Sequence, residues 1–407
     1  MERFTGSFTQ QEPIPEAAIA AALRVMQSGR LHRYNTTPDE IAEAALLEEE
    51  FAATTGARYC LAVASGGYAL ATALRALGVQ PGERVLTNAF TLAPVPGAIA
   101  SVGAVPVFVG VTEGLVIDLD DLAAKAEGVR VLMLSHMRGH ICDMEALMRL
   151  CDARGITVIE DCAHTMGAAW DGRLTGRWGA MGCFSTQTYK HMNSGEGGLI
   201  IADDPTLMAR AVLLSGSYML YGRHRAAPPP EAFADLRLTT PNISGRMDNL
   251  RAAILRPQLA DLPRQCTRWN ERYRVVEAGL AETPGLTRIK RPAAEGFVAS
   301  SFQFLLLDWQ PEAIHAVIAR CGARGVELKW FGAPEPVAFT SRYDSWTYAP
   351  SAPMPATDRI LHGIIDMRLP LTFSVEDCAQ IARIIRAEVS AVFQGDTSAP
   401  DLTPRAD

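Results

Sequence analysis

The sequence predicts an α/β protein with a largely parallel central sheet, followed by a smaller C-terminal α/β unit. From about residue 38, short β-rich runs alternate with stretches of helical periodicity, which is typical of a parallel sheet covered by helices. Beyond about residue 285, a new β-rich run, SFQFLLLDW, lies among further helical stretches. The chain is long enough for one large core and a second, smaller one.

The larger unit begins with an amphipathic stretch, DEIAEAALLEEEFAATTG, and an apolar run, YCLAVA, which predict a helix and then a buried strand. Further helices are predicted at 67–77, 92–102, 118–127 and 143–154. Further strands are predicted near 84–87, 105–109, 130–135, 156–160, 181–185 and 198–202. Because ligands of such sheets bind at the carboxyl ends of the strands, the chemistry is expected just after these runs.

Residues 217–241 interrupt this alternation with three consecutive prolines and predict a long surface loop. A long helix is expected at about 246–280, and the C-terminal unit is expected to contain helices at 311–323 and 375–393. We therefore divide the chain into a large domain (1–255), a small domain (256–395) and a disordered polar tail (396–407). Several polar and aromatic residues are equally compatible with substrate binding and with subunit packing: Tyr218, Tyr221, Arg223, His224, Lys329 and Trp330.

Composition excludes several classes of function. A net charge of -7 and a pI near 5.7 provide no positive field for nucleic acid or an anionic membrane surface. No stretch reaches the roughly 18 apolar residues of a membrane span, and the N-terminus does not resemble a secretory signal. The eight cysteines are scattered without a C-x-x-C pair, so we expect reduced thiols in a cytoplasmic protein, and no metal site is predicted.

Two strand ends offer an acid and an amine. The strand ITVIE ends at Asp161, and after the strand MGCF the chain continues through Ser185 to Lys190 and a GEGG segment. Pyridoxal phosphate (PLP) chemistry needs this pair, because the amine forms a Schiff base and moves a proton while the acid keeps the pyridine nitrogen protonated. Taken alone, such a lysine is usually a solvated surface residue and such an acid a helix cap or ion-pair partner. Together they favour a cofactor site.

A phosphate site is predicted in the segment ASGGYALATALRALG. Gly66 and Gly67 lie between a strand and a helix, so that backbone N–H groups and the positive end of the helix face an anion. The hydroxyl of Ser185 is a further candidate donor. These residues complete a PLP site of amine, acid and phosphate cradle.

The chain resembles the DegT-type sugar aminotransferases, which are fold-type I PLP enzymes with a large domain and a smaller C-terminal α/β domain. The resemblance runs through VASGGYALATALRALGVQPGERVLTNAF, EDCAHTMGAAWDGRLTGRWGAMGCFS, YKHMNSGEGGLIIADD, GRMDNLRAAILRPQL and LPLTFSVEDCAQIARII, in order and over nearly the whole chain. It implies that Lys190 forms the Schiff base and Asp161 pairs with the pyridine nitrogen. It places His164 near the ring hydroxyl of the cofactor and Ser185 on its phosphate.

The same resemblance marks three places where this chain departs from the family pattern. The family's phosphate turn reads Ser-Gly-Gly-Tyr here, which leaves the backbone donors of Gly67 and Tyr68 as candidates. The aromatic residue that stacks on the cofactor aligns with Leu92, and Phe90 is an off-register candidate for that contact. The asparagine that reaches the phosphate of the neighbouring subunit aligns with Ser244.

We therefore expect a homodimeric PLP-dependent aminotransferase that takes an amino group from L-glutamate or L-glutamine and gives it to a keto-sugar, keto-cyclitol or similar cyclic ketone. Two alternatives are kept. One is a PLP-dependent lyase or dehydratase on the same scaffold, because some relatives resemble aminohydroxybenzoate synthases. The other is a PLP-binding regulatory protein without turnover, suggested by the altered phosphate turn and disfavoured by the intact Lys190 and Asp161.

Overall fold

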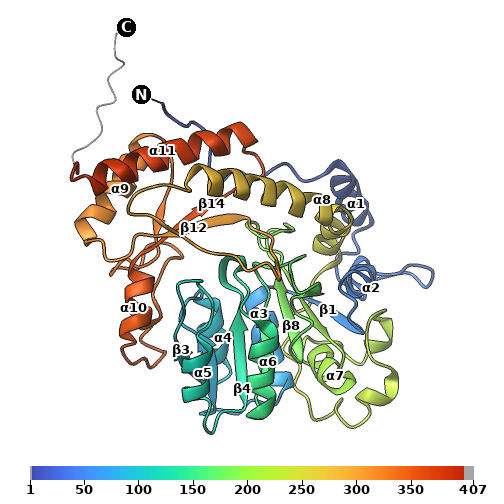
Figure 1. Ribbon diagram of the computed structural model, residues 1–407. Helices are drawn as coiled ribbons and strands as arrows, with labels where there is room; N and C mark the ends of the chain where they lie inside the picture. Colours follow the sequence, from blue (N-terminus) through green and yellow to red (C-terminus); the bar gives the residue numbers. More distant parts are fainter. Residues whose placement is uncertain (1, 398–407) are drawn as a thin grey trace.

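The fold is known from a computed structural model that describes residues 2–397. A seven-stranded sheet forms the centre of the larger unit (Figure 1), in the order β1-β9-β8-β5-β4-β2-β3. Its strands are β1 (Tyr59–Val63), β2 (Arg84–Asn88), β3 (Val105–Val109), β4 (Val131–Ser135), β5 (Thr157–Asp161), β8 (Met181–Ser185) and β9 (Gly198–Ala202). Only β9 among these strands runs antiparallel to its neighbours, β1 and β8. The predicted strands and the largely parallel sheet are confirmed.

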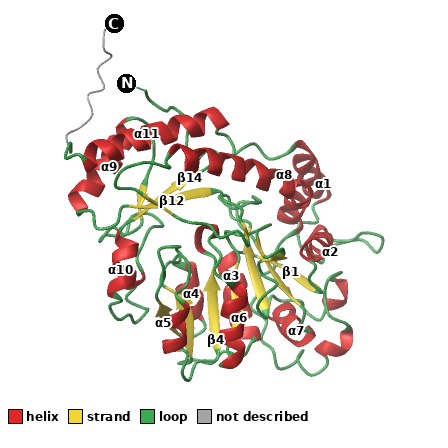
Figure 2. Ribbon diagram, in the orientation of Figure 1, coloured by secondary structure: helices red, strands yellow, loops and turns green. Residues whose placement is uncertain are grey.

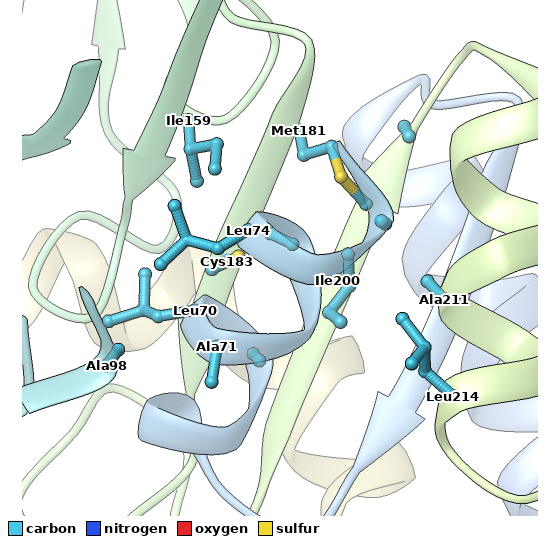
Figure 3. Packing of buried hydrophobic residues seen from close by; sticks show 14 of the residues in the cluster. Leu70, Ala71, Leu74, Ala98, Ile159, Met181, Cys183, Ile200, Ala211 and Leu214 are labelled. Atoms are coloured by element: carbon cyan, nitrogen blue, oxygen red, sulfur yellow. The ribbon is translucent and has the colours of Figure 1, made fainter. Parts of the chain in front are cut away.

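Helices cover both faces of this sheet, as the red and yellow layers of Figure 2 show. They are α2 (Glu43–Thr55), α3 (Gly66–Ala76), α4 (Pro94–Ser101), α5 (Leu119–Lys125), α6 (Met144–Ala153) and α7 (Pro205–Leu214). Alternate residues of a strand face opposite helix layers. Met133 of β4 belongs to a hydrophobic cluster with residues of α3 and α7, whereas its neighbour Leu132 belongs to a second cluster with residues of α5 and α6. Figure 3 shows Leu70 and Leu74 of α3 packed against the sheet beside Ile159.

The C-terminal unit contains an antiparallel four-stranded sheet in the order β10-β12-β14-β13. Its strands are β10 (Thr287–Arg288), β12 (Ser301–Leu305), β13 (Lys329–Trp330) and β14 (Ile364–Arg368), and its helices are α9 (Pro311–Ala323), α10 (Pro355–His362) and α11 (Val375–Phe393). The predicted β-rich run and two of these helices are confirmed. The sequence reading did not identify β14 or α10.

The long helix α8 (Asn249–Gly279) is one continuous element although it contains Pro257 and Pro263. It packs against α1, α2 and α11 and so links the two units along their length (Figure 1). The predicted domain boundary at 255/256 falls inside this helix and stays a prediction. Most of the predicted disordered tail (396–407) lies outside the described residues.

The N-terminal part contains one helix that was not predicted, and the predicted loop at 217–241 is confirmed. Residues 1–37 contain a helix, α1 (Glu16–Ser28), that the sequence reading passed over because prolines precede it. The 217–241 segment is a loop with two short 3-10 turns, η2 (Tyr221–Arg223) and η3 (Pro230–Phe233), and it is anchored by the buried ring of Phe233.

A small three-stranded sheet is formed by β6 (Ala169–Trp170), β7 (Arg173–Leu174) and β11 (Glu295–Gly296). Within residues 2–397, no helix has the length and hydropathy needed to cross a bilayer.

Candidate active site

A cavity of about 540 Å³ opens where the carboxyl ends of the central strands meet the C-terminal unit. The segments that line it follow β1, β2, β4, β5 and β8, and others come from the loops and strand of the second sheet. This is the position that the sequence predicted for the chemistry. Of the candidates proposed above, it brings together Gly66, Gly67, Leu92, Asp161, His164, Ser185 and Lys190.

The Lys190 amine lies in this cavity, 3.0 Å from Nε2 of His164. Burial lowers the pKa of Lys190 to about 7, and the nearby guanidinium of Arg138 adds to this effect. Burial and the adjacent Lys190 hold the pKa of His164 well below its usual range, so the imidazole is neutral and accepts a hydrogen bond from the amine. Near neutral pH a large fraction of the amine is therefore uncharged, which is the form that attacks a carbonyl carbon.

Asp161 ends β5 and turns its carboxylate into the cavity. Its Oδ2 accepts a hydrogen bond from the Ser135 hydroxyl at 2.9 Å, and its Oδ1 accepts one from the Ala163 N–H at 3.1 Å. Ser135 ends the adjacent strand β4, so parallel pairing of two strand ends fixes both residues. The carboxylate thus keeps a fixed direction and is suited to hold a protonated ring nitrogen.

The neighbouring acid, Glu160, has a different task. Its carboxylate is fully buried and accepts hydrogen bonds from the backbone N–H groups of Gly176, Trp178 and Gly179 and one from His136. Successive side chains of a strand point to opposite sides, so only one of the two acids reaches the cavity. Glu160 shapes the turn before β8, and Asp161 serves the site.

The two glycines that begin α3, Gly66 and Gly67, line the cavity together with Ser185. The first N–H groups of a helix have no acceptor within the helix, so this end of α3 is suited to an anion in the cavity. A Cβ at Gly66 would lie 2.8 Å from Cβ of Ser185, so only glycine allows this close approach. The Tyr68 N–H is already used, since it donates to Oγ of Ser65 at 3.1 Å.

Phe90, the off-register candidate for stacking on the cofactor, lies elsewhere in the structure. The ring of Phe90 is fully buried and packs edge-on against Phe331 at 4.9 Å, in a core formed with the C-terminal unit. It does not line the cavity, whereas Leu92 does. The side chain of Tyr68 points away from the cavity, because its hydroxyl donates to the carbonyl of Leu214 and its ring packs over Gly245. The expectation for Phe90 is corrected, since tertiary packing takes its ring into the core, whereas a phosphate contact of the Tyr68 backbone stays a prediction.

Ser244 lies outside the cavity on an exposed segment. Its backbone has a positive φ of 61° and its hydroxyl accepts a hydrogen bond from Arg246 at 2.8 Å. Its role at a neighbouring subunit's phosphate stays a prediction. In the 217–241 loop, His224 is buried against Glu48 and Arg33 and so serves to anchor the loop.

The structure adds cavity residues that the sequence reading missed. They are Arg138, Tyr189, Trp269, Phe339 and Arg368, among others. Arg138 comes shortly after the end of β4 at Ser135. Its place after a strand end is the signal that could have identified it. Arg368 ends β14, a strand that the sequence reading did not identify, and Phe339 comes from a loop without periodicity.

Comparison with known proteins identifies the family. Residues 14–386 match the DegT/DnrJ/EryC1/StrS aminotransferase family. The chain belongs to this family. Its relatives include a putative L-glutamine:3-amino-2,3-dideoxy-scyllo-inosose aminotransferase of Micromonospora echinospora, 35% identical over 60% of this chain and 59% of that protein. The corresponding protein of Streptoalloteichus tenebrarius is 30% identical over 80% of this chain and 78% of its own length.

Other relatives carry names of different activities. A 3-amino-5-hydroxybenzoate synthase of Amycolatopsis mediterranei is 34% identical over 59% of this chain and 60% of its own length. Thus the match spans less than two thirds of two of these three relatives. Among solved structures, a 3-amino-5-hydroxybenzoic acid synthase is 27% identical, with a TM-score of 0.80 over 94% of this chain and 98% of that one. The predicted fold class and family resemblance are confirmed.

PLP, the cofactor predicted from the sequence, is confirmed by membership of this aminotransferase family. The cavity also fits that group physically. Lys190 offers an amine with a lowered pKa, and Asp161 offers a fixed carboxylate. The cradle of Gly66, Gly67 and Ser185 offers N–H and O–H donors for a phosphate and excludes a side chain at Gly66.

Proposed function

We propose that this chain is a PLP-dependent aminotransferase that moves an amino group from L-glutamate or L-glutamine to a keto-sugar, keto-cyclitol or similar cyclic ketone. One observation carries the proposal: the Lys190 amine, with a pKa lowered to about 7, faces the same cavity as Asp161 and is held at 3.0 Å from His164. The names of the inosose aminotransferase relatives support this class of acceptor.

Each residue has a physical task in this reaction. Bound PLP supplies a ring that accepts the electrons of the bond broken at the substrate carbon. Asp161, oriented by Ser135, keeps the ring nitrogen protonated. Lys190 holds the cofactor and then carries a proton on Nζ between two carbons, and neutral His164 keeps that atom in place between transfers. Gly66, Gly67 and Ser185 hold the phosphate and so fix the ring.

We also propose that the enzyme is a homodimer whose subunits share their active sites. The outer face of α1 supports this, because Ile19, Leu23 and Met26 are 53%, 47% and 53% exposed and lie at helical spacing on one side. Ser244 lies on an exposed segment from which it can reach a second copy. The eight cysteines are free thiols, which fits the reducing cytoplasm as location.

The test is the absorption spectrum of the purified protein before and after addition of L-glutamine or L-glutamate. An aminotransferase gives a yellow protein that loses its long-wavelength band when the donor converts PLP to its amine form. A yellow protein that ignores both donors would favour the lyase or the regulatory protein instead. A protein that does not bind PLP at all would contradict the proposal.

A further inference from the structure

Arg368 is a cation in the active-site cavity whose charge has no partner in the described chain. It ends β14, and its side chain lines the cavity. Within residues 2–397, its side chain forms no hydrogen bond or ion pair, and its guanidinium lies over two aromatic rings. Its Cζ lies 3.8 Å from the ring centroid of Tyr189 and 4.9 Å from that of Phe339.

The other cations around Phe339 are compensated, which sets Arg368 apart. Arg138 donates to Oδ2 of Asp366 at 2.6 Å, in a buried ion pair. Lys329 lies 4.2 Å from the Phe339 centroid and pairs with Glu327 at 3.2 Å. The carboxylate of Asp366 is also occupied by Gln303, which donates to its second oxygen. No acid is left over for Arg368 in this cluster.

The aromatic contacts determine which part of the guanidinium remains available. Rings stabilise a guanidinium through its flat faces and give no acceptor for its N–H groups. The N–H edge of Arg368 therefore needs a partner from solvent or from a ligand. A carboxylate fits this edge best, because its two oxygens match two parallel N–H donors.

Because Arg368 lies in the reaction cavity, its unpaired N–H groups restrict which substrates bind well. In a two-step transfer, donor and acceptor occupy the same cavity in turn. The amino acid donor brings a carboxylate of its own. The hydroxyls of a neutral acceptor ring would accept single hydrogen bonds from Arg368 but would leave its charge uncompensated, which is less favourable. An acceptor with a carboxylate avoids this loss.

We propose that Arg368 is a specificity-determining residue that binds a carboxylate of the acceptor, so that the natural acceptor is a cyclic ketone bearing a carboxylate. This inference rests on the proposed function, which it narrows from cyclic ketones in general to anionic ones. The charges of the cavity agree with it: after burial, Arg138 lowers the pKa of Lys190, Asp161 opposes this, and Arg368 lowers the pKa further. A bound carboxylate would offset part of that positive field.

The test compares two ketones that differ only in charge, 3-oxocyclohexanecarboxylate and 3-oxocyclohexanecarboxamide. Their dissociation constants are measured by calorimetry on the holoenzyme after L-glutamine has converted its cofactor to the amine form. Wild type should bind the carboxylate at least about tenfold more tightly than the amide. Arg368→Gln should lose this preference, and Arg368→Lys should keep part of it because it retains the charge without the fork.

Arg359→Gln is the matched control, because Arg359 is an exposed arginine paired with Asp308 away from the cavity, and it should keep the wild-type preference. Equal binding of the two ketones by wild type, or an unchanged preference in Arg368→Gln, would overturn the inference. The cofactor spectrum with L-glutamine is recorded on the same samples. A normal spectral conversion without a carboxylate preference contradicts only this inference, whereas absence of conversion contradicts the proposed function itself.

Discussion

Nζ of Lys190 and Nε2 of His164 lie 3.0 Å apart, although 26 residues separate them in the chain. Strands β5 and β8 are neighbours in the sheet, and each residue follows the carboxyl end of one of them. The contact is thus a direct result of parallel pairing. It places an amine with a lowered pKa beside a neutral imidazole.

The apo-protein should show the energetic cost of keeping Lys190 in this site. Because its pKa is lowered from 10.5 to about 7, the unfolded chain binds more protons between these pH values, and stability rises with pH through this window. Lys190→Met should therefore stabilise the apo-protein at pH 6 by on the order of 1–2 kcal/mol and by less near pH 10. Urea unfolding at both pH values measures this. Lys290→Met, at an exposed lysine, should leave the free energy of unfolding unchanged at both pH values. If Lys190→Met stabilised the protein equally at pH 6 and pH 10, the lowered pKa of Lys190 would be contradicted.

Gly66→Ala should weaken cofactor binding without unfolding the protein. The new Cβ would lie 2.8 Å from Cβ of Ser185, so the serine must move out of the phosphate cradle. We expect PLP affinity to fall by about tenfold or more, which corresponds to loss of a charge-assisted hydrogen bond. Titration of the apo-protein with PLP, followed by absorbance, measures it. Gly322→Ala is the control, since its Cβ meets nothing within 4 Å.

Ser135→Ala should reveal how much the orientation of Asp161 matters. The variant removes the 2.9 Å hydrogen bond to Oδ2 and leaves the carboxylate in place. We expect PLP affinity to fall by about fivefold, as for a typical lost hydrogen bond, and Asp161→Ala to cause a larger loss. Equilibrium titration with PLP compares the three proteins. If Ser135→Ala weakened binding as much as Asp161→Ala, the hydroxyl rather than the carboxylate would hold the cofactor.

Glu48→Gln should destabilise the fold strongly. Glu48 is fully buried and accepts hydrogen bonds from Arg33, His224 and the Ala62 N–H. Burial alone would raise its pKa, but Arg33 and His224 outweigh this and lower it to about 2. The substitution leaves Arg33 buried without a counter-charge, at a cost of about 3–5 kcal/mol by urea unfolding at neutral pH.

The adjacent Glu49→Gln is its control, because Glu49 pairs with Arg225 at the exposed surface and should change stability little. The contribution of Glu48 is present above about pH 4.5 and is lost as pH falls toward 2. The difference in free energy of unfolding between wild type and Glu48→Gln should therefore become smaller as the pH falls from about 4.5 toward 2. An equal effect of both substitutions at neutral pH would show that the buried cluster does not stabilise the fold.

The sequence by itself determined the α/β class, the order of the central strands and helices, and the segments that carry the chemistry. Local signals were sufficient for these, because apolar runs such as 59–64 and glycine turns such as 66–67 specify strands and turns through their own residues. Lys190, Asp161 and Ser185 could be proposed because each follows such a strand, and resemblance to a family added their roles.

Only the tertiary structure decided which side chains share the cavity. Phe90 looked available from its position near a strand end, but Phe331, distant in the chain, packs against its ring in the core. Arg368 comes from a strand some 178 residues beyond Lys190, and its contacts depend on how the C-terminal sheet meets the central one. Local periodicity encodes single elements, whereas the partners of a side chain depend on contacts between segments far apart, which no local pattern contains.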